Sequence, residues 1–302
     1  MKKKKQNILV FGCSGLLGKC LIDFYQYNNK LNIHAVINKT KIHNKNIKTV
    51  FFKDKQAIKN YIDRNVIHTI INFAALTSIE LCEKKFNLSK KINYLLPIYL
   101  AKISKEKNLN YVFISTDNFR FKEKKLKENS KIHSINNYGR HKQKSESQIL
   151  KINSKSIIIR TNFYSIGNKK RQSFSDKILQ SIKSKEHVNL FKDVYYTPIY
   201  GKYLLKYIFN LLEKKQKGIF NISSNEKITK FEFGQKICNI FKLDNKLIKI
   251  SYLSKRKDLI KRPFNMALNN NKVKKILQIK IPSINYQIKM MKKDILYLKK
   301  KK

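Results

Sequence analysis

NILVFGCSGLLG, residues 7–18, joins a mostly apolar run to three of the eight glycines in this 302-residue chain. The apolar run predicts a buried strand, and the glycines predict a tight turn that leads into a helix near Leu16. In dinucleotide-binding proteins, the N–H groups of such a turn and the positive end of the helix face a pyrophosphate. The G-x-x-G-x-x-G spacing differs by one residue from the usual G-x-G-x-x-G. A purely structural glycine turn is therefore the alternative interpretation.

The turn and the end of the second predicted strand are the expected contacts of a dinucleotide. The second strand, 33–37, is followed by Asn38 and Lys39 rather than by Asp or Glu. A carboxylate there would bind a ribose 2′-hydroxyl and repel a 2′-phosphate, whereas Lys39 could attract the phosphate. The sequence therefore favours NADPH, with NADH as the alternative. The expected contacts are Gly12, Ser14, Gly15, Leu16, Leu17, Gly18, Asn38 and Lys39.

The composition is that of a globular protein with an unusual positive charge. Hydrophobic residues make up 42% of the chain, and 67 Lys and Arg against 19 Asp and Glu give a formal net charge of +48. The lysines are spread along the whole chain, and Asn and Ile are abundant, as an AT-rich genome would give. We interpret the charge as solvated surface and compositional background, with a nucleic-acid partner as the less favoured alternative. A diffuse positive field would still attract an anionic nucleotide.

The four cysteines show no C-x-x-C pair and no metal-like spacing with the six histidines. We therefore expect no disulfide framework and no metal site, and a reducing, cytoplasmic setting. The lysines of residues 2–5 precede an apolar run that is too short for a signal peptide. No segment approaches the ~20 apolar residues of a membrane span, so we expect no membrane contact.

Apolar and amphipathic segments alternate along the chain, which predicts an α/β fold of the Rossmann type. The expected architecture is a doubly wound parallel sheet with a smaller α/β C-terminal substrate lobe. We assign residues 1–165 to the NAD(P)-binding domain and 166–302 mainly to the substrate-binding lobe, partly interleaved with the Rossmann sheet. The predicted strands are 7–11, 33–37, 48–52, 68–72, 110–115, 156–160, 188–192, 218–222 and 247–252. The predicted helices are 16–28, 55–64, 88–107, 136–152, 174–184, 201–214, 230–241 and 285–298.

Tyr138 and Lys142 are four residues apart and would share one face of the helix predicted at 136–152. An ammonium beside a phenol stabilises phenolate and lowers its pKa from about 10. Such a tyrosine can exchange a proton with a carbonyl or alcohol oxygen. Alone, the Y-x-x-x-K spacing is common by chance in a lysine-rich chain.

Polar and small residues follow two of the predicted strands, where a doubly wound sheet binds its ligands. Ser115, Thr116 and Asp117 end the strand at 110–115, and a hydroxyl there could hold a substrate carbonyl against Tyr138. A helix cap or a turn is the alternative, because Ser, Thr and Asp favour both. Asn72-Phe73-Ala74-Ala75 follows the strand at 68–72, and its small residues would let a cofactor ring approach the backbone; ordinary loop packing is the alternative.

Taken in chain order, these motifs resemble the extended short-chain dehydrogenase/reductases. They are Gly12-x-x-Gly15-x-x-Gly18, Asn72-x-Ala74-Ala75, Ser115-Thr116-Asp117 and Tyr138-x-x-x-Lys142. Finer features resemble the dTDP-4-dehydrorhamnose reductase branch, and the resemblance runs from about residue 7 to 280. These features are the segment 74–80 with Glu83, the pair Ile92-Asn93, and the segments 159–161, 218–222 and 262–268.

The resemblance implies NAD(P)H-dependent reduction of the keto group of a nucleotide-linked 4-keto-6-deoxysugar, used in surface polysaccharide synthesis. Tyr138 would give a proton to the keto oxygen, Lys142 would hold the nicotinamide ribose and tune Tyr138, and Thr116 would orient the carbonyl. Ala74, Ala75 and Ser115 are further expected cofactor contacts. Thr77, Thr116, Asp117, Phe163 and Arg262 are the expected substrate contacts, with Arg262 on the diphosphate because a guanidinium matches phosphate oxygens. A homodimer is one expected assembly.

The chain departs from the family pattern at three places. Asn118 stands where the family commonly has Tyr after Ser-Thr-Asp, and Asn162-Phe163 stands where Ser-Trp is usual. An acidic residue often found after the third strand is missing, at Phe51 or nearby. All three changes affect recognition of the sugar or the adenosine rather than proton transfer.

Three alternatives remain open at this point. A nucleotide-sugar epimerase or dehydratase of the same superfamily would show no net consumption of NAD(P)H. A non-catalytic, nucleotide-binding regulatory subunit would keep the fold without turnover. A polyanion-binding protein would bind nucleic acid with a steep salt dependence and would not need the glycine turn.

Overall fold

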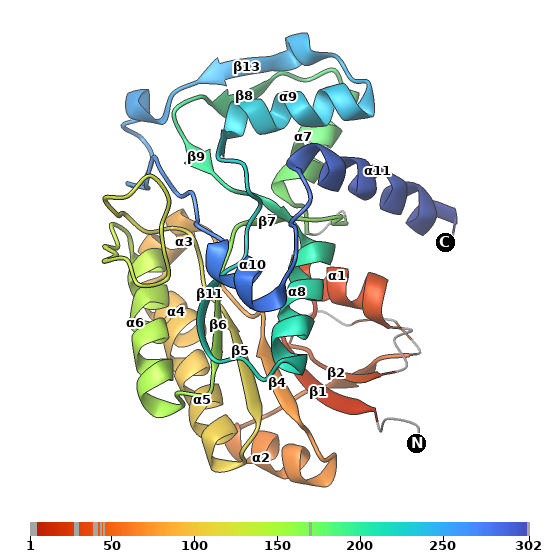
Figure 1. Ribbon diagram of the computed structural model, residues 1–302, viewed down its shortest axis with the longest axis vertical. Coiled ribbons are helices and arrows are strands. Elements are labelled where there is room, and N and C mark those ends of the chain that lie inside the picture. Colours follow the sequence, from red (N-terminus) through yellow and green to blue (C-terminus); the bar gives the residue numbers. More distant parts are fainter. Residues whose placement is uncertain are drawn as a thin grey trace.

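A seven-stranded parallel sheet forms the centre of the computed structural model, which describes residues 5–26, 30–38, 42, 44, 46–168 and 171–300 (Figure 1). The strand order is β11-β6-β5-β4-β1-β2-β3. The strands are β1 Gln6–Phe11, β2 Leu31–Val36, β3 Lys48–Val50, β4 Thr69–Asn72, β5 Asn110–Ile114, β6 Ile157–Arg160 and β11 Gly218–Asn221. The carboxyl end of β1 leads directly into the glycine turn and α1, Leu16–Tyr25.

Helices cover both faces of this sheet, and β1 shows why. Ile8 and Val10 belong to the core under α1 and α8, whereas Leu9 and Phe11 belong to the core under α2, α5 and α6. Successive side chains of a strand point to opposite faces, so a strand buried on both sides is apolar throughout. The covering helices are α2 Lys55–Arg64, α5 Leu96–Glu106, α6 Asn137–Ile152, α8 Gly201–Glu213 and α10 Asn271–Leu277. The predicted doubly wound α/β fold is confirmed.

A smaller lobe with its own core lies beside the carboxyl end of the sheet (Figure 1). Phe233, Ile237 and Leu190 are central to that core. The lobe pairs β8 Val188–Phe191 with β13 Ile248–Ser251, and β9 Tyr195–Tyr196 with β12 Ile228–Thr229. Its helices are α7 Phe174–Lys183, α9 Lys230–Phe241 and α11 Ile284–Lys300.

The chain crosses between the two parts more than once. β11 comes from the segment after residue 165, yet it extends the main sheet by pairing with β6, Gly218 opposite Ile157. A further short pair, β7 Phe163–Tyr164 with β10 Ile199–Tyr200, lies between the parts. The two-residue strands and the short helices α3 Ile79–Lys84 and α10 were not predicted, because such short elements carry little periodic signal. The helix predicted at 88–107 begins within α4, Phe86–Lys90. A π-helical turn at Lys91–Leu95 joins α4 to α5.

The described ranges contain neither a candidate membrane span nor a candidate metal cluster. No helix there is both long and apolar enough to span a bilayer. No group of three or more His, Cys, Asp or Glu side chains there is arranged to hold a metal.

Candidate active site

Gly12 holds the turn after β1 against the loop after β4. Its φ is +82°, a left-handed conformation that glycine adopts without strain. A Cβ atom there would lie 2.5 Å from the backbone nitrogen of Ala74. Glycine therefore lets the two segments meet, and this places Ala74 and Ala75 beside the turn. At Gly18 a Cβ would lie 2.3 Å from the backbone of Cys13, so glycine also lets α1 pack on the turn.

Gly15 starts α1 without a side-chain cap. In α2, α3, α6, α7 and α9 a side chain accepts a hydrogen bond from the first turn, but the residue before α1 has no side chain to do so. Packing restricts Gly15 less than its neighbours in the motif, since a Cβ there would meet one protein atom, the oxygen of Gly12 at 3.1 Å. The N–H groups at the start of α1 are therefore open to an anion.

The other predicted cofactor contacts lie along the same edge of the sheet. Ser14 and Leu16 are half-buried, whereas Leu17 is buried in the core, so only its backbone can contact a dinucleotide. Asn38 is exposed just beyond β2. Lys39 lies outside the described residues, and its contact with a 2′-phosphate stays a prediction.

Tyr138 lies in the first turn of α6, beside Thr116 at the end of β5. Asn136 caps this helix by accepting a hydrogen bond from the N–H of Gly139 at 2.8 Å. The side chain of Tyr138 is buried, and the Thr116 hydroxyl lies near enough to its phenol to affect the pKa. Burial raises the pKa of Tyr138 above its usual value, and the Thr116 hydroxyl opposes this increase. The lowering of this pKa that was predicted from the Lys142 ammonium is therefore wrong for this structure, because burial is the larger effect. The phenol therefore keeps its proton at neutral pH, as a proton donor must.

Lys142 lies one turn further along α6 and is fully buried. Its Nζ donates to the carbonyl oxygen of Ile114 at 2.8 Å and lies 4.5 Å from the centre of the Phe113 ring. Burial lowers the pKa of Lys142 to about 7, and the carboxylate of Glu146 opposes this decrease. The ammonium is thus fixed at the carboxyl end of β5, on the same helix as Tyr138.

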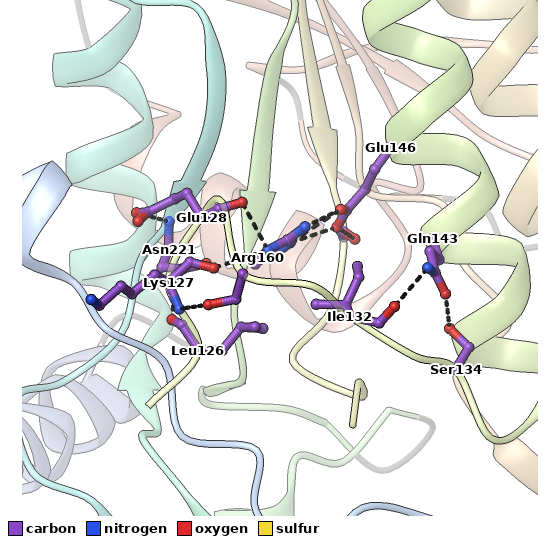
Figure 2. A network of polar contacts seen from close by, with 11 residues as sticks. Leu126, Lys127, Glu128, Ile132, Ser134, Gln143, Glu146, Arg160 and Asn221 are labelled. Atoms are coloured by element: carbon purple, nitrogen blue, oxygen red, sulfur yellow. Dashed lines mark hydrogen bonds and ion pairs between the residues drawn. The ribbon is translucent and has the colours of Figure 1, made fainter. Parts of the chain in front are cut away.

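Arg160 and Glu146 form a buried ion pair beneath these residues (Figure 2). Arg160 Nη2 donates to Glu146 Oε2 at 2.7 Å, and Nε lies 3.1 Å from both carboxylate oxygens. The hydroxyl of Ser115 donates to the same carboxylate. Ser115, predicted to contact the cofactor, thus directs its hydroxyl to Glu146 in this structure.

The same arginine also holds the loop that follows β5. Arg160 Nη1 donates to the carbonyl oxygens of Lys127 and Glu128 at 3.4 and 3.3 Å (Figure 2). The side chain of Glu128 in turn accepts from the N–H of Asn221 in β11 at 3.0 Å. One guanidinium therefore connects α6, the end of β5 and the loop over β11.

Asp117, after β5, interacts with Lys230 of the smaller lobe. Asp117 is buried, accepts a hydrogen bond from Asn162 Nδ2 at 2.8 Å, and raises the pKa of the nearby Tyr138. Burial raises the pKa of Asp117 to about 6, and the charge of Lys230 opposes this increase. Lys230 starts α9, and its Nζ lies 3.4 Å from the centre of the Tyr196 ring. Asp117 thus interacts electrostatically with Tyr138 on α6 and with Lys230 of the smaller lobe.

We expect Asp117→Asn to stabilise the protein more at neutral pH than in acid. Because the folded pKa of Asp117 exceeds its ordinary value of 3.8, the folded state binds a proton that the unfolded state releases between about pH 4 and about pH 6. The stability of the parent protein therefore falls as the pH rises through this window, and an asparagine removes that loss. Urea unfolding of both proteins at the two ends of the window measures the difference. An equal difference at both pH values would contradict the raised pKa.

Arg262 lines a cavity of about 460 Å³ between the loop after β5 and the segment 253–265. Arg120, Arg256 and Phe264 share this cavity. Arg262 is ion-paired with Glu80 and donates from Nε to the carbonyl oxygen of Ile260 at 3.1 Å. The residue predicted to bind a diphosphate therefore stands at a basic cavity but already has a carboxylate partner.

Thr77 and Phe163 are the remaining predicted substrate contacts, and some residues of the site were missed by the sequence analysis. Thr77 is exposed in the loop before α3, and Phe163 in β7 packs against the main core. Glu146 could have been found, because it follows Lys142 by one helical turn. Asn162 and Lys230 carry no local signal that relates them to Asp117, since only the tertiary fold brings them together.

Comparison with known proteins gives one family. The model of the RmlD substrate binding domain matches residues 6–296. A dTDP-4-dehydrorhamnose reductase from Aggregatibacter actinomycetemcomitans is 25% identical over 292 residues, which are 90% of this chain and 94% of that protein. Methionine adenosyltransferase 2 subunit beta from Xenopus laevis is 23% identical over 279 residues, 90% of this chain and 82% of that protein.

The fold also matches a solved structure over nearly its whole length. The dTDP-4-dehydrorhamnose reductase of Bacillus anthracis, crystallised in complex with NADP, superposes with a TM-score of 0.81 at 20% sequence identity. The match covers 95% of this chain and 99% of that one. The arrangement of sheet and lobe is therefore that of these proteins.

Proposed function

Because the chain belongs to the RmlD substrate-binding domain family, within the extended short-chain dehydrogenase/reductases, we propose that it is an NAD(P)H-dependent reductase of a nucleotide-linked 4-keto-6-deoxysugar. The place of the buried Tyr138 phenol beside Thr116 at the end of β5, one helical turn from the buried Lys142, is the observation that carries the proposal. A phenol that is buried and protonated, next to a second hydroxyl, is suited to donate a proton to a keto oxygen.

The residues at the start of α1 fit a dinucleotide. The uncapped N–H groups and the positive helix end suit its pyrophosphate, and Gly15 leaves the start of the helix accessible. Ala74 and Ala75 lie against the turn and would border the dinucleotide. Bound there, NAD(P)H would supply a hydride to the keto carbon. NADPH is the proposed form, because Asn38 follows β2 where a carboxylate would repel a 2′-phosphate.

Side chains of the protein would then bind the sugar and donate the proton. Tyr138 would donate its proton to the oxygen of the carbonyl, which the Thr116 hydroxyl orients. The ammonium of Lys142 would stabilise the phenolate left on Tyr138 and hold the nicotinamide ribose. Asp117 and Lys230 are the proposed contacts for the sugar hydroxyls. The hydroxyl of Tyr196 is buried without a hydrogen-bond partner among the described residues, which leaves it available to the same ligand.

The basic cavity is the proposed site of the nucleoside diphosphate. Arg120, Arg256 and Arg262 would bind phosphate oxygens there, and Phe264 lies on the same wall. Since Arg262 is paired with Glu80, it would exchange this partner for the diphosphate. The proposal includes a cytoplasmic setting, where the four buried, unpaired cysteines stay reduced. A homodimer stays a prediction.

A regulatory subunit is the second candidate, and the relative from Xenopus laevis favours it. That protein is named as a subunit of a methionine adenosyltransferase, and its sequence is similar to 90% of this chain. Tyr138, Thr116 and Lys142 support turnover in this chain, whereas the loop that begins at Asn118 lacks the family's aromatic residue. Turnover therefore separates the two candidates.

The test measures NADPH oxidation by the purified protein in the presence of dTDP-4-dehydro-6-deoxy-L-mannose. The decrease in nicotinamide absorbance reports the reaction. We expect one NADPH to be consumed for each sugar reduced, with NADH used less well. Conversion of the sugar without net NADPH consumption would indicate an epimerase. Tight NADPH binding without turnover on this or other nucleotide-linked keto sugars would favour the regulatory subunit.

A further inference from the structure

Phe51 is the most exposed aromatic side chain in the described part of the chain. It directly follows β3, and 59% of its surface is exposed. The next residue, Phe52, behaves differently: its ring lies 6.4 Å from that of Phe11 and 5.4 Å from that of Tyr61. Because successive side chains in an extended chain alternate, Phe51 points away from this apolar cluster. No aromatic ring or cation among the described residues lies against it.

Phe51 stands in line with the glycine turn along the carboxyl edge of the sheet. Phe11, Val36 and Val50 are register partners at the ends of β1, β2 and β3. Beyond them, the N–H of Ile37 donates to the carbonyl oxygen of Val50 at 2.8 Å. Neighbouring strands lie ~4.8 Å apart, so Phe51 is about 10 Å from Gly12 along this edge. That separation suits a nucleoside whose pyrophosphate lies at the turn.

Two charged side chains that follow Phe51 closely in the sequence, those of Asp54 and Lys55, already have partners. The carboxylate of Asp54 is the nearest in the sequence, but it caps α2 by accepting from the N–H of Ala57 at 2.7 Å. The ammonium of Lys55 lies 5.2 Å from the centre of the Tyr99 ring. The exposed ring of Phe51 is therefore one group that this edge of the sheet offers to a base.

We propose that Phe51 stacks on the adenine of the dinucleotide and that the protein recognises this base by its face rather than by its amino group. The inference rests on the dinucleotide-binding part of the proposed function. Stacking is tolerant of the base, because every base presents an aromatic face. A site that hydrogen-bonds the amino group would instead reject an analogue that lacks it, since its own polar group would be left unpaired.

The first measurement compares NADPH with the reduced nicotinamide hypoxanthine dinucleotide phosphate, which has an oxygen in place of the adenine amino group. Both are titrated into the full-length protein without sugar, and nicotinamide fluorescence gives each Kd. We expect the two Kd values to agree within about threefold, as stacking predicts. A Kd for the hypoxanthine analogue that is tenfold or more above that for NADPH would overturn the proposal.

The second measurement removes and restores the ring. Phe51→Ala should raise the Kd of both dinucleotides about tenfold, in the range found for loss of one base-stacking side chain. Phe51→Trp should leave both Kd values unchanged. Tyr286→Ala is the matched control, because Tyr286 is 50% exposed on α11 in the other lobe. An unchanged Kd in Phe51→Ala would overturn the stacking while leaving the reductase proposal intact. Failure of the parent protein to bind either dinucleotide would overturn both.

Discussion

Tyr138→Phe should lower kcat for keto-sugar reduction about a thousandfold, within the range of ~10²–10⁴ that a positioned general acid contributes. The substitution removes only the phenol oxygen, and the buried ring keeps its packing. The Kd for NADPH should stay nearly unchanged, because the glycine turn and the start of α1 are not altered. Steady-state NADPH oxidation and fluorescence titration of the cofactor measure the two quantities.

Tyr207→Phe provides the matched control. Tyr207 is also a buried tyrosine, but it lies on α8, which covers the opposite face of the sheet from α6. The Tyr207→Phe variant also loses a phenol oxygen and should keep full activity. Near-normal turnover in Tyr138→Phe would remove Tyr138 as the proton donor and would reopen the assignment of the whole site.

Arg160→Met should strongly destabilise the folded protein. Removing one partner of a buried ion pair leaves the other charge unpaired, which costs about 3–5 kcal/mol of the free energy of unfolding. The side chains of Arg160 and Glu146 are 3% and 4% exposed, so water cannot replace the lost partner easily. The change also releases the carbonyl groups of Lys127 and Glu128. Urea unfolding followed by circular dichroism gives the free energy.

Two further variants test this explanation. Arg256→Met removes an arginine from a solvent-exposed pair with Asp258 and should leave the unfolding midpoint nearly unchanged. Combining Arg160→Met with Glu146→Gln should cost less than the sum of the single changes, because the charge left unpaired is then also removed. Equal effects of Arg160→Met and Arg256→Met would show that burial does not determine the cost.

The order of strands and helices could be predicted because the strongest signals were local. The apolar run 7–11 and the alternation of short apolar and longer amphipathic segments reflect strands buried on both faces and helices with one buried stripe. The two-residue strands β7, β9, β10 and β12 could not be predicted, since they are defined by their partners. That 218–222 belongs to the main sheet also depends on pairing with residues some sixty positions earlier.

Some features of the candidate site could likewise be predicted from local sequence, whereas others depend on the tertiary fold. Helical spacing placed Tyr138 and Lys142 on one helix, and the end of a predicted strand placed Thr116, because both signals are local in the sequence. The direction of the Ser115 hydroxyl toward Glu146, and the pairing of Arg262 with Glu80, depend on which side chains the fold makes neighbours. Lys230 reaches Asp117 only because α9 of the smaller lobe starts at the carboxyl edge of the sheet. Long-range electrostatic pairs of this kind leave no periodic trace.

The place of β11 at the end of the sheet has a consequence for synthesis on the ribosome. The N-terminus of the chain leaves the ribosome first, so β1 to β6 can pair before β11, Gly218–Asn221, has been made. Until then the outer edge of β6 presents unpaired N–H and C=O groups that can pair with another nascent chain. The first half of this protein therefore keeps an open sheet edge during translation until β11 has been made.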